Sequence, residues 1–127
     1  MNPKTILVVD DEYYSAEILS FVLESEGHRV LTAVNGRDGL DKLKLSPIDL
    51  VILDVMMPIM NGAEMALAMQ ADPALTRLPI LITSAMSEAV LQGMFNRYQG
   101  YLRKPFQMSQ VLAAVSSLLS DEDRQPA

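Results

Sequence analysis

The stretch from Asp49 to Gly62 constrains the fold more than any other part of the chain. Residues 50–53 are all aliphatic, which is typical of a strand buried on both faces of a parallel sheet. Asp54 follows directly, and the chain then reaches a proline and an Asn-Gly pair that favour a turn and a helix start. We therefore expect Asp54 at the carboxyl end of a buried strand, where open α/β sheets bind their ligands.

The rest of the chain repeats this strand-then-helix pattern. Short apolar runs typical of strands occupy residues 6–9, 29–34, 80–83 and 100–103. Helical spacing and boundary residues predict helices over residues 12–26, 36–46, 62–71 and 107–119, and a further helix that follows a turn at residues 84–87 and ends near residue 97. This alternation predicts an α/β fold: a three-layer, doubly wound, five-stranded parallel sheet of flavodoxin-like (βα)5 type, with strand order 2-1-3-4-5.

Length and composition narrow the functional classes. A chain of 127 residues, half of them hydrophobic, is enough for one domain, which we expect over residues 1–120, with a disordered tail at 121–127. The net charge of −6 argues against direct nucleic-acid or anionic-membrane partners. Cysteine is absent, which excludes thiolate sites, and no apolar run suits a signal peptide or a membrane span. We expect a cytoplasmic protein.

Three carboxylates should meet at one edge of this sheet. In the expected strand order, the strands that precede Asp10-Asp11 and Asp54 are neighbours. Clustered carboxylates raise one another's pKa unless a cation holds them. Because all the ligands are oxygens, the expected cation is Mg²⁺, with Mn²⁺ tolerated. A carboxylate in such a site is also a competent nucleophile toward phosphorus.

Two further strand ends supply groups that suit a phosphoryl ligand. Ser84 can present a hydroxyl to a phosphoryl oxygen, and Lys104 an ammonium. Taken singly, Ser84 is explained as a helix cap and Lys104 as a surface lysine. Their joint position at the carboxyl edge favours the phosphoryl site. Lys104-Pro105 is also a candidate cis-proline turn.

Several short motifs occur together and in a fixed order: Asp10-Asp11, Asp54, Met57-Pro58, Gly62, Ser84-Ala85 and Lys104-Pro105-Phe106. On these motifs the chain, from Lys4 to Leu119, resembles the receiver domain of two-component response regulators, of the chemotaxis-regulator type. The resemblance implies that Asp54 accepts a phosphoryl group from a phosphohistidine on a sensor kinase or a histidine phosphotransfer protein. It also implies a signalling switch that catalyses its own phosphorylation and dephosphorylation, not an enzyme with an external product.

The resemblance assigns a role to each candidate metal ligand. It implies that Asp11 and Asp54 ligate Mg²⁺ together with the backbone carbonyl of Met56, and that Asp10 helps through a water. Met56 and Met86 are expected to flank the path of the water that hydrolyses the phosphoryl group. Neither side chain can orient a water, so we expect slow self-dephosphorylation.

The resemblance also predicts how phosphorylation changes the output surface. Lys104 pairs with the phosphoryl group, and Ser84 and Tyr101 form a switch pair in which the hydroxyl moves toward the phosphate and the ring turns inward. The expected output surface comprises the helix after Ser84, the strand 100–103 and the helix 107–119. A downstream effector domain or protein, or a phosphorylation-dependent dimer, would use this surface.

The segment between Ser84 and Lys104 is shorter than is usual in such domains. In addition, Tyr98-Gln99-Gly100 stands where many relatives carry Gly-Ala and an acidic residue. We therefore expect the helix after Ser84 to be short, displaced or partly unwound.

Other functions that use related chemistry fit the sequence less well. A phosphohydrolase of the haloacid-dehalogenase kind needs a second acid two residues after its nucleophile, where this chain has Met56. A flavin-binding flavodoxin needs phosphate donors after the first strand, where Asp10-Asp11-Glu12 would repel a phosphate. A pseudo-receiver would have lost a core residue, and none is missing.

Overall fold

The computed structural model describes the backbone of residues 3–124 and the side chains of residues 3–120. Its core is a five-stranded parallel sheet in the order β2-β1-β3-β4-β5. The strands are β1 Thr5–Val9, β2 Arg29–Ala33, β3 Leu50–Asp54, β4 Ile80–Ser84 and β5 Gly100–Arg103. The predicted fold class and strand order are confirmed.

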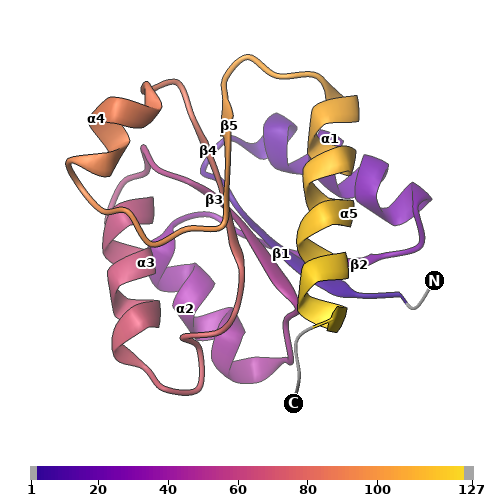
Figure 1. Cartoon of the computed structure of the whole chain (residues 1–127), viewed down its shortest axis with the longest axis horizontal. Helices are drawn as coiled ribbons and strands as arrows, with labels where there is room; N and C mark the ends of the chain where they lie inside the picture. Colours follow the sequence, from indigo (N-terminus) through magenta and orange to yellow (C-terminus); the bar gives the residue numbers. More distant parts are fainter. Residues whose placement is uncertain (1–2, 125–127) are drawn as a thin grey trace.

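Helices cover both faces of the sheet and complete the three layers (Figure 1). They are α1 Tyr13–Ser25, α2 Gly36–Leu45, α3 Gly62–Ala71, α4 Glu88–Gln92 and α5 Met108–Arg124. Helices α1 and α5 lie on one face, and α2, α3 and α4 on the other. Alternate residues of each strand therefore enter different cores: Ile6 and Val8 pack toward α1 and α5, and Leu7 and Val9 toward α2 and α3.

Short-range hydrogen bonds fix the helix starts near the carboxyl edge of the sheet. Asn61 and Glu64 form a capping box at α3, in which the Asn61 side chain accepts from the Glu64 N–H at 2.9 Å and the Glu64 carboxylate accepts from the Asn61 N–H at 3.0 Å. The Asn35 side chain accepts from the Asp38 N–H at 2.8 Å at the start of α2. Both helix starts predicted from Asn-Gly pairs are confirmed.

Two helix ends differ from the sequence prediction. Helix α4 ends at Gln92, not at residue 97, which confirms the expectation of a short helix. Phe95, beyond its end, is buried and packs edge-to-face against Tyr98, so side-chain packing of an irregular segment replaces the missing helical turns.

Helix α5 continues to Arg124, past the expected end at Leu119. Part of the segment assigned to a disordered tail is thus helical, because no glycine or proline follows Leu119 before Pro126. Residues 125–127 of that segment lie outside the described residues.

Gly62 joins α3 closely to the end of β3. Its N–H donates to the Val55 carbonyl at 2.9 Å, and a Cβ at this position would lie 2.3 Å from the carbonyl oxygen of Asp54. A side chain here cannot fit without moving the backbone. The glycine therefore allows the loop after Asp54 to fold back tightly onto the strand.

We expect Gly62→Ala to destabilise the protein by about 2 to 4 kcal/mol, because the clash is with backbone atoms that cannot rotate away. Urea unfolding monitored by circular dichroism measures this loss. Gly93→Ala is the matched control, since its added Cβ would come no closer than 3.3 Å to the Val90 carbonyl oxygen. Equal stability of the two variants would contradict this account of Gly62.

Candidate functional site

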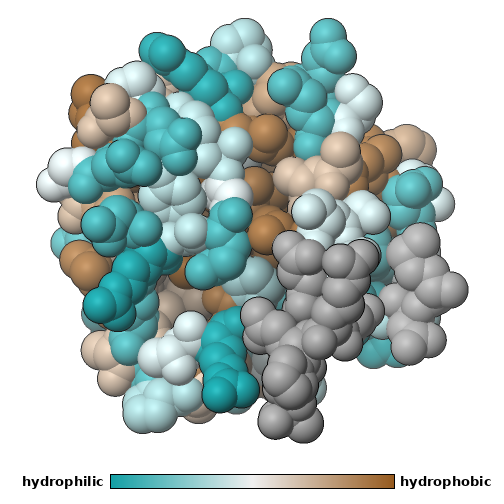
Figure 2. Space-filling model, in the orientation of Figure 1, coloured by the Kyte–Doolittle hydropathy of each residue, from teal (hydrophilic) through white to brown (hydrophobic). Residues whose placement is uncertain are grey.

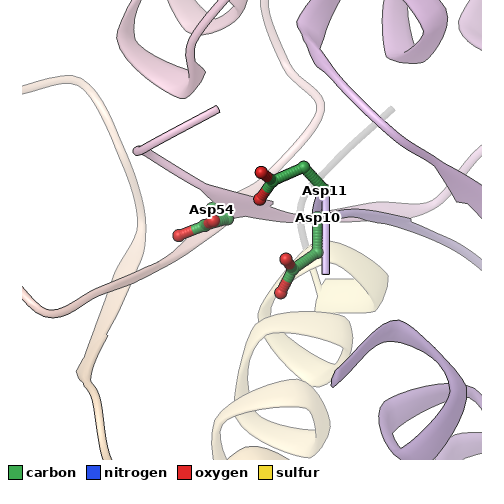
Figure 3. Close-up of side chains that lie close together, drawn as sticks. All are labelled: Asp10, Asp11 and Asp54. Carbon is green, nitrogen blue, oxygen red and sulfur yellow. The ribbon is translucent and has the colours of Figure 1, made fainter. Parts of the chain in front are cut away.

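The sheet order brings three acidic side chains together at the carboxyl edge. Val9 of β1 pairs with Leu53 of β3, so Asp10 and Asp54 follow at matching positions on neighbouring strands. One carboxylate oxygen from each of Asp10, Asp11 and Asp54 lies within 4.8 Å of the others. Figure 3 shows Asp10 and Asp11 extending from the end of β1 and Asp54 from the end of β3.

The three carboxylates differ in exposure and in partners. Asp10 and Asp54 are only 5% and 6% exposed, whereas Asp11 is open to solvent. One Asp10 oxygen accepts the Glu12 N–H at 2.8 Å, at the start of α1. Within the described part of the chain, no hydrogen bond or ion pair engages the Asp11 carboxylate. Asp11 is therefore the carboxylate most free to take a ligand.

Lys104 reaches the cluster from the end of β5. Its Nζ lies 3.3 Å from an Asp54 oxygen and 3.6 Å from an Asp10 oxygen. Its peptide bond to Pro105 is cis, as predicted. One ammonium does not neutralise three carboxylates, so the site keeps an excess of negative charge.

The environment of Asp54 is unfavourable for its own charge. Burial raises the pKa of Asp54 to about 6; the ammonium of Lys104 opposes this rise, and the charges of Asp10 and Asp11 add to it. A bound cation would relieve the repulsion among these groups. Three oxygen ligands with no nitrogen or sulfur donor fit a hard divalent ion such as Mg²⁺.

Ser84 and Tyr101 are linked through the backbone of one residue. Ser84 is fully buried at the end of β4 and follows Thr83, which pairs with Asp54. Its hydroxyl oxygen accepts the Met86 N–H at 3.0 Å. The Tyr101 hydroxyl donates to the Met86 carbonyl. Both residues predicted to form a switch pair thus hydrogen-bond to the backbone of Met86.

The two methionines predicted to influence phosphate lifetime differ in exposure. Met56 is 65% exposed in the loop after β3, and Met86 is half-buried in the loop after β4. Met56 is therefore the more solvent-exposed of the two side chains.

The structure also reveals two features that the sequence analysis missed. The Arg103 Nε donates to the Ala85 carbonyl at 3.2 Å, next to Ser84. A mainly apolar hollow of about 420 Å³ opens beside the site, between α1 and the segment after β5, and its lining includes Asp10, Ile18 and Phe106. No local motif predicts either feature, because each depends on segments far apart in the sequence.

The fold and the site place this chain among the doubly wound α/β proteins. An acid cluster and a lysine lie at the carboxyl edge of its sheet. A family profile described as the response regulator receiver domain matches residues 6–116. The chain therefore belongs to the receiver domain family of two-component response regulators.

Curated relatives agree with this assignment. The response regulator ArlR of Staphylococcus aureus is 35% identical over 123 residues, which are 95% of this chain and 53% of ArlR. The DNA-binding response regulator MtrA of Mycobacterium tuberculosis is 34% identical over 124 residues, or 96% of this chain and 53% of MtrA. The chain thus spans about half the length of the curated relatives it matches.

Solved structures show the same similarity along nearly their whole length. Response regulator protein TrrA of Thermotoga maritima, in complex with Mg²⁺-BeF, is 33% identical with a TM-score of 0.81, and the match covers 91% of this chain and 98% of TrrA. Chemotaxis protein CheY4 of Vibrio cholerae is 29% identical with a TM-score of 0.84, covering 92% and 99%. The phosphohydrolase and flavodoxin alternatives are not favoured.

These matches bear on the expectation that the domain has no nucleic-acid partner. MtrA is named a DNA-binding protein, so the expectation of no nucleic-acid partner is not confirmed. Among the described residues, the helices are all too short or too polar to span a membrane.

The raised pKa of Asp54 predicts a gain in stability when its charge is removed. The pKa of about 6 in the folded protein exceeds the ordinary aspartate pKa of 3.8, so ionisation of Asp54 lowers stability as pH rises between these values, and the full loss is present above pH 6. Without Mg²⁺, we expect Asp54→Asn to stabilise the protein on the order of 1 to 2 kcal/mol at about pH 7.5, and progressively less toward pH 4.

Urea unfolding in the presence of a chelator at several pH values measures this difference. Asp41→Asn removes a similar charge from an exposed position on α2 and should change little at any pH. An Asp54→Asn variant that is less stable than the wild type at neutral pH would contradict the unfavourable environment assigned to this carboxylate.

Proposed function

We propose that the chain is a phosphorylation-controlled switch in which Asp54 is the phosphoacceptor. The observation that carries the proposal is the nearly buried Asp54 carboxylate, which lies beside two further carboxylates and 3.3 Å from the Lys104 ammonium. An oxygen nucleophile next to a fixed cation is what phosphoryl transfer requires.

In the proposed step, an Asp54 oxygen attacks the phosphorus of a phosphohistidine. The new O–P bond forms as the P–N bond breaks, and the bonding electrons leave with the imidazole, which takes up a proton. Lys104 offsets the negative charge on the transferring group. Asp11 and Asp54 with the Met56 carbonyl would hold Mg²⁺, with Asp10 acting through a water and Mn²⁺ tolerated. The metal supplies further positive charge to the phosphoryl oxygens.

The donor is proposed to be a sensor histidine kinase or a histidine phosphotransfer protein. The apolar hollow beside Asp10 and Lys104 supports approach of a protein donor, because an apolar surface next to the nucleophile can orient a protein partner. A cytoplasmic location suits such a donor. The domain catalyses its own phosphorylation and its own dephosphorylation, which releases inorganic phosphate, and it converts no external substrate.

The surface of α4, β5 and α5 is the proposed output face. Its edge strand β5 is only partly covered, and Figure 2 shows apolar side chains gathered in the middle of this face, between β5 and α5. Hydrogen bonds link this strand to the site, since Tyr101 contacts the loop that carries Ser84. An effector domain or protein, or a second copy after phosphorylation, would bind here.

Incubation with acetyl phosphate and Mg²⁺ should add one acid-stable, base-labile phosphate at Asp54, measured by intact-mass and peptide mass spectrometry. Asp54→Asn and chelation of the metal should each abolish it, because one removes the nucleophile and the other the charge offset. Incorporation that persists in both would remove Asp54 and the metal from their proposed roles. Continuous hydrolysis of p-nitrophenyl phosphate would instead favour a phosphohydrolase.

The phosphoryl group on Asp54 is proposed to be long-lived. Hydrolysis needs a water in line behind phosphorus, and polar side chains near that path can orient it. Met56 and Met86, two residues beyond Asp54 and Ser84, offer no such group. A tenfold slowing corresponds to only about 1.4 kcal/mol of barrier, so one side chain is enough to change the lifetime.

Decay of the phosphorylated form should therefore quicken, by roughly three- to tenfold, in Met56→Asn and in Met86→Gln. The measurement is loss of the phosphorylated mass with time after the donor is removed. Met94→Gln, a similar change at an exposed position beyond α4, is the control and should leave decay unaltered. Unchanged or slower decay in both test variants would show that these methionines do not control the water.

A further inference from the structure

Three consecutive backbone carbonyls, beginning at the last residue of β4, each accept a hydrogen bond from β5 or from the residue that follows it. We call residues 84–86 the Ser84 loop. The Ser84 carbonyl accepts the Lys104 N–H at 2.8 Å, the Ala85 carbonyl accepts the Arg103 Nε at 3.2 Å, and the Met86 carbonyl accepts the Tyr101 hydroxyl. Two of these three bonds come from side chains, so they depend on the residue types at 101 and 103.

The sheet geometry explains why these two side chains reach the loop. Ile82 pairs with Tyr101 and Ser84 pairs with Arg103 in the parallel register. Alternate residues of a strand point to the same face, so Tyr101 and Arg103 project on the side of the sheet where the chain turns into the loop. Each of the three residues of the Ser84 loop therefore accepts a hydrogen bond from β5 or from Lys104.

The held loop also fixes the Ser84 hydroxyl. The fully buried Oγ accepts the Met86 N–H at 3.0 Å, and a serine hydroxyl that accepts one hydrogen bond still has its own proton to donate. Capture of a phosphoryl oxygen by this proton requires neither the Met86 N–H bond nor the Tyr101 bond to break. The contacts between Ser84 and Tyr101 can thus be the same before and after phosphorylation.

We propose that Arg103 is a positioning residue which, with Tyr101, holds the Ser84 loop and so keeps the Ser84 hydroxyl in place for a phosphoryl group on Asp54. The inference rests on the proposed phosphoacceptor role of Asp54 and deepens its regulation. Loss of the Arg103 hydrogen bond would then loosen the loop and the Ser84 hydroxyl without removing any group that contacts the phosphoryl oxygens.

The first test is the rate of phosphorylation as a function of acetyl phosphate concentration, with saturating Mg²⁺. Arg103→Ala should lower the maximal rate about three- to tenfold, the change expected for loss of one hydrogen bond, with little change in the half-saturating donor concentration. Arg103→Lys should restore most of the rate, since an ammonium can still donate to the Ala85 carbonyl. Arg77→Ala removes an equal charge from the exposed connection after α3 and should behave as the wild type.

A higher half-saturating concentration with an unchanged maximal rate would overturn the inference. That result would mean that Arg103 only attracts the anionic donor through its charge, an effect that added salt would suppress. Equal kinetics in Arg103→Ala and Arg77→Ala would overturn it as well.

The second test examines the free protein by hydrogen exchange of a peptide that contains the Met86 amide. Wild type should be protected without phosphodonor, and Mg²⁺ with beryllofluoride should add little protection. Arg103→Ala and Tyr101→Phe should exchange faster and recover protection when beryllofluoride binds. A wild-type loop that exchanges freely until beryllofluoride is added would overturn the inference.

The two tests separate this inference from the proposed function. If wild type takes no phosphate on Asp54, the proposed function fails, whatever the exchange shows of the loop. If wild type is phosphorylated but Arg103→Ala matches it in rate and in exchange, the proposed function stands and the role of Arg103 is refuted.

Discussion

The main constraint on this structure is the placement of carboxylates at the ends of hydrophobic strands. Strand β3 is buried throughout and ends in Asp54, whose carboxylate therefore loses most of its hydration. Burial and two neighbouring carboxylates disfavour its charge, and a single ammonium from Lys104 only partly compensates. A site with this imbalance has a strong tendency to bind a cation, a proton or an electrophilic phosphorus, and its chemistry follows from that tendency.

Several distant parts of the chain hold these charged side chains close together. Gly62 lets α3 approach the end of β3 closely, and the capping box at Asn61 fixes where that helix begins. The hydrogen bond from the Glu12 N–H orients Asp10, while Asp11 stays open to ligands. The site is thus rigid where it must hold charges together and open where a ligand enters.

The link between the site and the edge strand consists of hydrogen bonds between side chains and backbone groups. Ser84 accepts the Met86 N–H, Tyr101 donates to the Met86 carbonyl, and Arg103 donates to the Ala85 carbonyl. Helix α4 has five residues, and the segment that follows is held by the N–H groups of Met94 and Phe95, which donate to the Leu91 carbonyl, and by the packing of Phe95 against Tyr98. The hydrogen bonds between the site and the edge of the sheet therefore lie between β5 and the loop that follows β4.

The strand order, the helix starts at Asn35 and Asn61, and the clustering of three aspartates could all be predicted from the sequence. Apolar periodicity and capping are local properties, and parallel strands share one carboxyl edge. The short helix after Ser84 was predictable as well. The end of α4, the extent of the rise in the pKa of Asp54, and the contact of Arg103 with Ala85 could not be predicted and come from the three-dimensional packing. These depend on packing between residues far apart in the chain, which no local pattern encodes.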